Sequence, residues 1–251
     1  MKLKLMQQLS ALALALGLAA SAQAQQTFFG EDTGQGDTTP LASTPNADQA
    51  RANFLAALAT SFGTEDFEGF DDADVAPLVV DFTVGTATLT GGGGFVEEIA
   101  MGLTNNDGRY PTSGTKYWDT DRNFTITFSE PIRAFGFSGI DMGDFNGRLS
   151  FTYGSEIIDI PHTVNGVSGS VLFFGIIADD PFTTVSFANS DAGDVFGFDD
   201  FTVARLRDDI PPPPPPPTPR GTADIPVDNP FALGILILLL CTFAAYAIRR
   251  D

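Results

Sequence analysis

Hydrophobic and polar residues alternate with a period of two along much of the chain after Gly63. In the clearest case, Phe124, Ile126 and Phe128 are separated by single threonines. This alternation is typical of a β-strand with one face in a core. The same pattern occurs at 149–153 and 184–187, and weaker candidates cover 79–84 and 86–89.

The segment 171–177 is instead continuously apolar, which predicts a strand buried on both faces. Clusters of Gly, Asn and Asp at 91–94, 105–108 and 189–193 have the composition of turns. Roughly eight to ten short strands with such spacing predict an all-β fold, an antiparallel β-sandwich of the jelly-roll type.

One helix is predicted outside the termini, over 47–60, with Asn46 as its N-cap. At helical spacing its apolar face consists of Ala50, Phe54, Ala57 and Leu58. The segment 25–46 is rich in Gly, Thr, Asp and Pro, so we expect it to be disordered or loosely attached.

Three Phe/Gly motifs at 135–137, 173–175 and 196–198 do not form a repeat. We interpret them as strand interiors in which glycine allows close packing.

The N-terminus has the pattern of a secretory signal peptide. Lys2 and Lys4 precede an apolar run at 9–20, and Ala-Gln-Ala at 22–24 forms a cleavage site. The run is shorter than the roughly 20 residues that a membrane-spanning helix needs, which argues against an uncleaved anchor. We therefore expect the mature chain to begin near Gln25.

The C-terminus combines a spacer with an apolar helix. Seven prolines at 211–217 favour an extended polyproline II stalk, a simpler explanation than a docking ligand. The uncharged stretch 231–248 would extend about 27 Å as a helix, enough to cross a bilayer. It is too uniformly apolar for a buried core helix, and Arg249 and Arg250 behind it predict a cytoplasmic end.

The end of the chain resembles the IPTL-CTERM and PEP-CTERM class of bacterial sorting tails. The residues that carry the resemblance are Ile225, Pro226, Phe231, Arg249 and Arg250, whereas Val227 and Asp228 stand where Thr and Leu are usual. The resemblance implies a surface or secreted protein of a Gram-negative bacterium that makes extracellular matrix. It also implies cleavage of the tail by an exosortase-like membrane protease.

The sequence thus divides into a signal peptide (1–24), a flexible segment with a short helix (25–62), a β-sandwich domain (63–207), a Pro-rich stalk (208–224) and the sorting signal (225–251). The central stretches 128–137 and 197–203 also resemble, more loosely, ectodomains attached to PEP-CTERM-type tails. Those ectodomains are mostly uncharacterised, so this likeness supports the architecture only.

The formal charge of −19 bears on possible partners: such a surface repels phosphate backbones, so we expect no nucleic-acid partner.

The single cysteine, Cys241, lies within the apolar tail, which excludes an intrachain disulfide. A lipidated Cys241 is a second interpretation of that residue. The stability of the domain must come from its core, to which the 23 phenylalanines contribute most.

Acidic residues give the candidate metal site. If the segment that opens the β region pairs with the closing strand, Glu68 approaches Asp199 and Asp200, and such a cluster suits a structural calcium ion. Asp141, in a loop without the EF-hand pattern, is a weaker candidate. Solvated turn carboxylates are the alternative interpretation.

Aromatic residues give the candidate ligand site. The loop 109–119 contains the only tryptophan, Trp118, with Tyr110 and Tyr117, and aromatic faces are what sugar rings stack on. Alternatively, these rings fold back onto the edge of the sandwich.

Catalysis has little support. The only histidine, His162, has the context of a surface loop and no nucleophile motif accompanies it. We therefore expect a non-enzymatic protein with a structural or adhesive role, associated with exopolysaccharide. A carbohydrate-binding module is the alternative, and a glycan-acting hydrolase, suggested only by the acidic residues, is the third.

Overall fold

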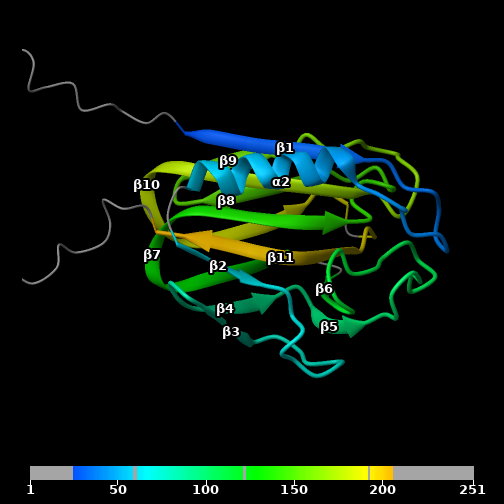
Figure 1. The fold of residues 1–251 in the computed structure, drawn as a ribbon, viewed down its shortest axis with the longest axis horizontal. Helices are drawn as coiled ribbons and strands as arrows, with labels where there is room; N and C mark the ends of the chain where they lie inside the picture. Colours follow the sequence, from blue (N-terminus) through cyan, green and yellow to red (C-terminus); the bar gives the residue numbers. More distant parts are fainter. Residues whose placement is uncertain (1–24, 59–60, 121–122, 192, 206–251) are drawn as a thin grey trace, which may run out of the picture. The chain divides into compact units, whose positions relative to one another are not determined.

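Within the residues that the structure describes, eleven strands form one sheet and one helix accompanies it (Figure 1). The order is β1 (Gln26–Asp32), α2 (Pro45–Leu58), β2 (Phe62–Glu65), β3 (Leu78–Phe82), β4 (Gly85–Gly91), β5 (Phe95–Glu98), β6 (Lys116–Thr120), β7 (Phe124–Ile140), β8 (Leu149–Tyr153), β9 (Glu156–Asp159), β10 (Val171–Asn189) and β11 (Phe196–Ala204). The computed structural model describes residues 25–58, 61–120, 123–191 and 193–205. The expected signal peptide, stalk and sorting tail, with Ile225, Pro226, Phe231, Arg249 and Arg250, lie outside the described residues. None of the helices within those ranges is long and apolar enough to cross a bilayer.

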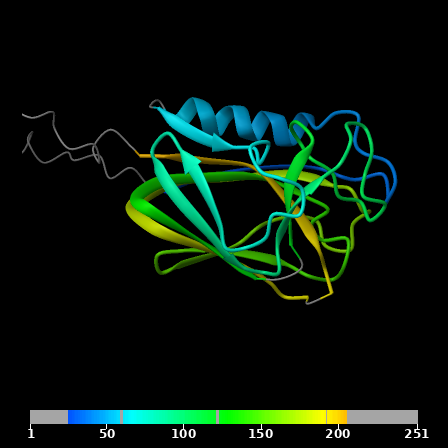
Figure 2. The same cartoon turned by 90° about the horizontal axis from the view of Figure 1, so that it is seen from below.

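Two long strands, β7 and β10, turn the sheet into two layers. They pair antiparallel from Ile140↔Val171 to Ala134↔Ile177, and again from Thr127↔Thr184 onward. Between these stretches the register shifts and both strands bend, so the sheet folds back over itself (Figure 2). Every strand pair among the described residues is antiparallel, which confirms the predicted all-β sandwich.

Phenylalanine rings fill the space between the layers. Phe187 lies 5.1 Å from Phe137 and 4.9 Å from Phe198 between ring centroids, and both pairs are edge-to-face. Phe124 stacks on Phe187 at 4.6 Å. Since aromatic pairs contribute about 0.5–1.5 kcal/mol beyond the burial of their area, this cluster stabilises the sandwich.

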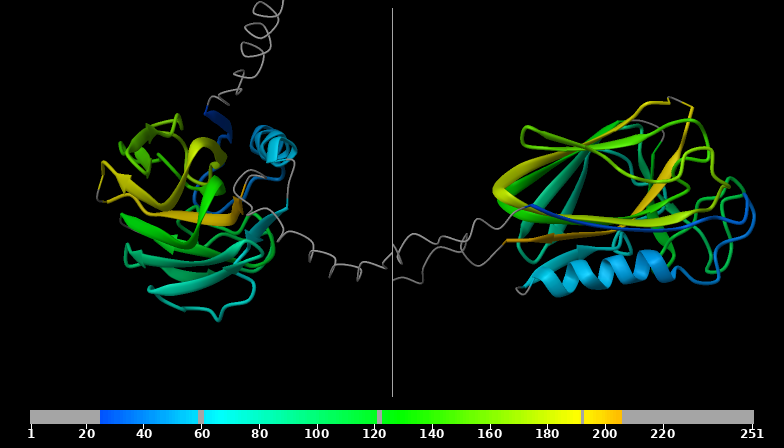
Figure 3. Two further views of the ribbon diagram at one scale, coloured as in Figure 1. Left: turned by 90° about the vertical axis from the view of Figure 1, so that its left-hand side faces the viewer. Right: turned by 90° about the horizontal axis from the view of Figure 1, so that it is seen from above.

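Helix α2 covers the outer face of the layer that contains β1, β10 and β7 (Figure 3). Its Phe54 ring lies 5.5 Å from both Phe28 and Phe173. Two opposed glycines, Gly136 and Gly175, leave room for that ring, since a Cβ on either would come within 2.8 Å of it. This explains why 171–177 is apolar throughout, and it confirms close packing at the first two Phe/Gly motifs.

The start of α2 differs from the prediction. Asp32, the last residue of β1, accepts hydrogen bonds from the backbone N–H groups of Asn46 and Ala47 at 3.0 and 2.9 Å. Asn46 is therefore within the helix and is not its N-cap. The expectation that 25–46 is loosely attached is wrong for β1, which pairs along its whole length with β10. Low apolar content misled the prediction, because hydrogen bonds to a neighbouring strand hold β1 in place.

The alternating segments form the strands that their pattern predicts. Phe124, Ile126 and Phe128 are buried in β7, and the apolar positions of β8 and of the second half of β10 are buried as well. The helix has the predicted face at Ala50, Phe54 and Leu58, whereas Ala57 is exposed. The strands β1, β5, β6 and β9 were not predicted, since none has a sustained alternation.

Candidate functional site

The predicted metal ligands hold a loop in place. Asp199 Oδ2 accepts hydrogen bonds from the backbone N–H groups of Thr112 and Ser113 at 2.8 and 3.0 Å and from the Thr112 hydroxyl at 2.9 Å. Glu68 Oε1 accepts from the backbone N–H groups of Thr115 and Lys116 at 2.6 and 2.7 Å. Both carboxylates thus bind the segment that leads into β6.

Strand pairing near these residues follows the prediction in part. β2, which opens the β region, pairs antiparallel with the closing strand β11, from Phe201↔Glu65 to Ala204↔Phe62. Asp200 lies 3.4 Å from the guanidinium of Arg51 on α2 and adopts a φ of 53° at a bulge in β11. Burial, with the charge of Asp200 beside it, raises the pKa of Asp199 well above its usual value.

The expected calcium ligands already have hydrogen-bond partners within the protein. Backbone and hydroxyl donors already occupy oxygens of Glu68, Asp199 and Asp200, and Asp141 Oδ1 accepts from Gly169 N at 2.7 Å. Across the described ranges, no group of three or more His, Cys, Asp or Glu side chains is arranged to hold a metal ion. Calcium binding stays a prediction, and the hydrogen bonds on these oxygens argue against it.

The candidate aromatic side chains are buried, which agrees with the alternative interpretation that they fold back onto the sandwich. Tyr117 and Trp118 are completely buried in β6, and Tyr110 is nearly so. The Trp118 indole packs over Gly94 and against Phe67, while the Tyr110 hydroxyl donates to Gly169 O at 2.9 Å. No face of these rings is open to a sugar, because β6 pairs with β5 and β11 on its two sides and both strand faces are covered.

The lone histidine is also buried, contrary to the surface loop that its context predicted. His162 Nε2 accepts from Leu149 N at 3.0 Å, and Nδ1 lies 2.9 Å from Thr163 O. Both contacts are satisfied by the neutral tautomer with its proton on Nδ1. Burial lowers the pKa of His162. The hydrogen bond from Leu149 N ties the imidazole to the first residue of β8.

Hollows lie instead among the loops that follow β1, β5 and β7 and those that precede β10 and β11. Two adjacent hollows of about 280 and 290 Å³ share Asp107, Arg109 and Val195 as a common wall. We call the two together the loop-end groove. Its other polar lining residues are Asp37, Asn105, Glu97, Asp119, Asp141, Asp144, Ser168 and Thr120, and its aromatic ones are Phe95 and Phe145.

Arg109 is the centre of this groove. Its Nε lies 2.7 Å from Asp119 Oδ2, and its terminal nitrogens lie 3.7 Å from Asp107 Oδ2 and 3.8 Å from Asp141 Oδ2. The Tyr117 hydroxyl donates to Glu97 Oε2 and lies 3.3 Å from Asp119 Oδ2. The network fixes polar side chains from β5, β6 and the end of β7 in one place.

Burial changes the ionisation of these acids. It raises the pKa of Asp119 to about 7, although the guanidinium of Arg109 opposes the shift. It likewise raises the pKa of Asp141 to about 8, against the hydrogen bond from Gly169 N. Both groups therefore titrate near neutral pH, where they exchange a hydrogen-bond donor for an acceptor.

A third acid with a raised pKa, Asp194, lies next to Asp144. Asp194 is 1% exposed, and burial, followed by the nearby Asp144 carboxylate, raises its pKa to about 7. The two carboxyl groups lie close enough to share a proton, and the Oδ1 atom of each is buried.

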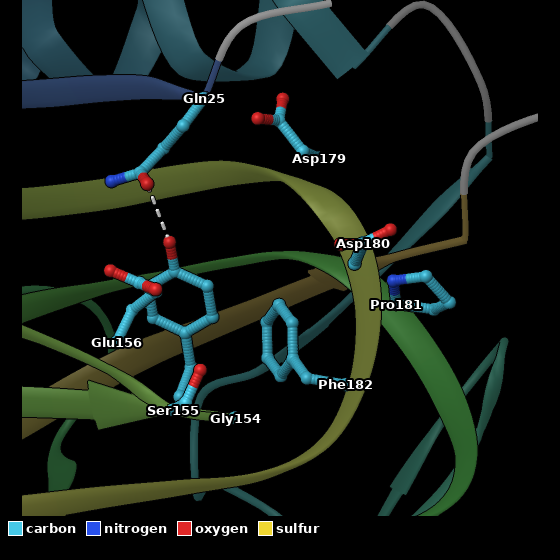
Figure 4. Close-up of a pocket in the computed structure, with 9 residues that line it drawn as sticks. Gln25, Gly154, Ser155, Glu156, Asp179, Asp180, Pro181 and Phe182 are labelled. Atoms are coloured by element: carbon cyan, nitrogen blue, oxygen red, sulfur yellow. Dashed lines mark hydrogen bonds between the residues drawn. The ribbon is translucent and has the colours of Figure 1, made fainter.

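Another hollow, of about 220 Å³, is separate from the loop-end groove and lies at the bend of β10 (Figure 4). The β8–β9 turn and the bend of β10 line it, and Phe182 forms part of its wall. The Tyr153 hydroxyl donates to Gln25 Oε1 at 2.6 Å across it, with Glu156 nearby (Figure 4). This hollow is a natural site for control variants, since it is also acidic but is formed by different elements.

Comparisons with known proteins add little to this geometry. No protein-family model matches the sequence, and neither does any curated protein. A solved structure that is similar over 56% of this chain and 94% of its own is the carbohydrate-binding module TmCBM61 in complex with beta-1,4-galactotriose. The sequence identity is 15% and the TM-score 0.29, a likeness too small to carry an argument.

Sequence reasoning named Asp141 and the loop 109–119, which supplies Arg109 and Asp119, but it did not predict that they meet in one groove with Asp144 and Phe145. Arg109, Asp119 and Asp144 come from three segments that the strand pairing brings together. The only available signal was the isolated cation Arg109 among many acids, and it does not by itself indicate which carboxylates it would meet.

Proposed function

We propose that this chain is an exported cell-surface or extracellular-matrix protein with an adhesive role, and that its sandwich binds glycans in the loop-end groove without catalysing a reaction. The observation that carries the proposal is the groove itself. Carboxylates and the guanidinium of Arg109 line the same hollow as the ring of Phe145, which is 52% exposed, and the amide of Asn105 lines the adjacent hollow.

The chemistry of the groove suits sugars. Sugar hydroxyl groups donate to carboxylates and accept from amide and guanidinium N–H groups, so Asp107, Asn105 and Arg109 offer both kinds of partner. The C–H face of a sugar ring packs on an aromatic face, for which Phe145 and the half-buried Phe95 are available. Each hollow is close to the smaller end of typical ligand pockets.

A glycan array, followed by calorimetry on its hits, tests this proposal. We expect Phe145→Ala to weaken binding about ten-fold through loss of the stacking ring, which corresponds to about 1.4 kcal/mol. Phe62→Ala is the matched control, since Phe62 is 38% exposed on β2, away from the groove. Binding to no glycan, or equal effects of the two variants, would reject the proposal.

Export and sorting support the adhesive role and are part of the proposal. The signal peptide, stalk and IPTL-CTERM-like tail would carry the domain to the outer side of the inner membrane, and an exosortase-like protease would then release it to the surface or medium. The mass of the intact protein from membranes and from medium tests this. A released form from Gln25 to about Pro226 is expected, and a full-length form confined to membranes would contradict it.

A further inference from the structure

We propose that Asp144 and Asp194 share one proton and thereby form a pH-sensitive latch between two segments that shape the loop-end groove. Asp144 and Phe145 belong to the segment after β7, whereas Asp194 and Val195 directly precede β11. Asp144, Phe145 and Val195 line the groove, so the acid pair joins one wall of the groove to another. The latch is a property of the fold and does not depend on glycan binding.

The two carboxyl groups meet away from solvent. Oδ1 of Asp144 and Oδ1 of Asp194 are both buried, and neither has another hydrogen-bond partner among the described residues. The second oxygen of Asp144 accepts from the Ser168 hydroxyl at 3.1 Å. A buried oxygen without a donor costs about 1–3 kcal/mol. One proton held between the two acids satisfies both oxygens and removes the repulsion between two adjacent carboxylates.

The charges around the pair do not replace this proton. The other acids near it are Asp191 on the segment of Asp194, Asp141 on the segment of Asp144, and Asp37 and Asp107 across the groove. Arg109 lies within 4 Å of three other carboxylates, and the guanidinium of Arg148 donates to Ile160 O at 3.1 Å. In the part of the chain that the structure describes, no ion pair joins a cation to Asp144 or Asp194.

The latch is closed at low pH and opens as the pH rises. Burial, followed by the Asp144 carboxylate, raises the pKa of Asp194 to about 7, so the native chain binds this proton more readily than the unfolded chain does. The stabilisation is fully present below the unfolded pKa of about 3.9 and is lost as pH rises through about 7. Above that pH two carboxylates face each other, and their repulsion loosens both segments.

Hydrogen exchange of the full-length chain at about pH 6 and about pH 8.5 tests the latch. Gly166 N donates to Gly143 O at 3.0 Å and Ser190 N donates to Arg148 O at 3.1 Å, so these amides report on the two segments. After correction for the intrinsic exchange rate, we expect the protection of both amides to fall about five-fold or more at the higher pH. The amide of Ala73, which also donates to a backbone carbonyl, is the control and should keep its protection.

Variants distinguish the acid pair from the acids around it. In Asp144→Asn and in Asp194→Asn an amide N–H donates to the remaining carboxylate at every pH, so the contact no longer needs a proton. We expect each variant to protect Gly166 and Ser190 equally at the two pH values. Asp141→Asn is the matched control, because it removes a neighbouring acid with a raised pKa and leaves the pair intact. It should keep the pH dependence of the unmodified chain.

Carbon-13 NMR of the side-chain carboxyl groups follows the proton directly and needs no variant for its first result. Asp194 should titrate near pH 7 in the unmodified chain, and at least about 1 pH unit lower in Asp144→Asn, where the repelling carboxylate is gone. Titration of Asp194 near its ordinary pKa of about 3.9 in the unmodified chain, or equal protection at the two pH values, would overturn the latch. A pH dependence that disappears in Asp141→Asn would overturn it as well and assign the effect to Asp141. None of these measurements uses a sugar, so a failure to bind glycans leaves the latch standing.

Discussion

The Nε of Arg109 lies 2.7 Å from Oδ2 of Asp119, and both side chains are largely withdrawn from solvent. Arg109 comes from a loop and Asp119 from β6, so the pair fastens the loop that follows β5 to the sheet. Because the pair is buried, removal of one partner is expected to cost more stability than the loss of an exposed ion pair would.

Arg109→Met should therefore destabilise the protein by about 3–5 kcal/mol, because the buried Asp119 carboxylate loses its partner and must take up a proton to stay buried. Urea unfolding at neutral pH measures this. The double variant Arg109→Met/Asp119→Asn should recover most of the loss. Equal losses in the single and double variants would show that the ion pair is not the cause.

Space for the Phe54 ring depends on two glycines. Gly136→Ala or Gly175→Ala should each cost about 1–3 kcal/mol, because the new methyl group would overlap Phe54 and displace α2. Thermal unfolding measures the change. In a Phe54→Ala background the same substitutions should cost much less, and an unchanged cost there would place the strain elsewhere.

The buried His162 should make stability depend on pH. Because burial lowers its pKa, the unfolded chain binds its proton more readily than the native chain does. The contribution is fully present above the unfolded pKa of about 6.5 and is lost as pH falls through the lower native pKa. His162→Gln should remove this part of the acid-side slope in a series of melting curves. An unchanged slope would contradict the assignment.

Asp141 should make stability depend on pH in the opposite direction. Burial raises the pKa of Asp141 to about 8, so the native state binds its proton more readily than the unfolded chain does. Its contribution is fully present below the unfolded pKa and is lost as pH rises to about 8. Asp141→Asn, which keeps an acceptor for Gly169 N, should reduce the loss of stability between about pH 5 and 9. A steeper loss in the variant would reverse the assignment.

Asp199 should control the order of the 112–116 segment. Asp199→Ala removes the acceptor of two backbone N–H groups and one hydroxyl, so we expect a loss of about 2–3 kcal/mol. Hydrogen exchange at Thr112 and Ser113 should become faster. The exposed Asp180→Ala is the control, and equally fast exchange in both variants would contradict this role.

Calcium binding by Glu68, Asp199 and Asp200 can be tested by comparing the melting temperature in calcium with that in EDTA. A melting temperature that is equal in calcium and in EDTA would reject it. The donors already present on these oxygens lead us to expect that equality.

The sequence alone determined the class of fold and the strands with a strong pattern. Successive side chains of a strand face opposite sides of the sheet, so a strand with one buried face shows alternation in its sequence, as at 124–128 and 149–153. The buried run at 171–177 and the glycines at 136 and 175 were predictable for the same reason. Local pattern also predicted a helix over 47–60, which the structure has over 45–58, but it did not predict the cap.

The tertiary structure decided what the polar and aromatic residues do. Trp118 and His162 look exposed in sequence because polar neighbours surround them, yet strand pairing on both sides of β6 buries one and the contact with β8 buries the other. Asp32 caps α2 from a strand at a distance of 14 residues. Arg109, Asp119 and Asp141 meet only because β6, β7 and β11 are neighbours in the sheet. Electrostatic contacts of this kind depend on separation in space, which a pattern along the chain does not contain.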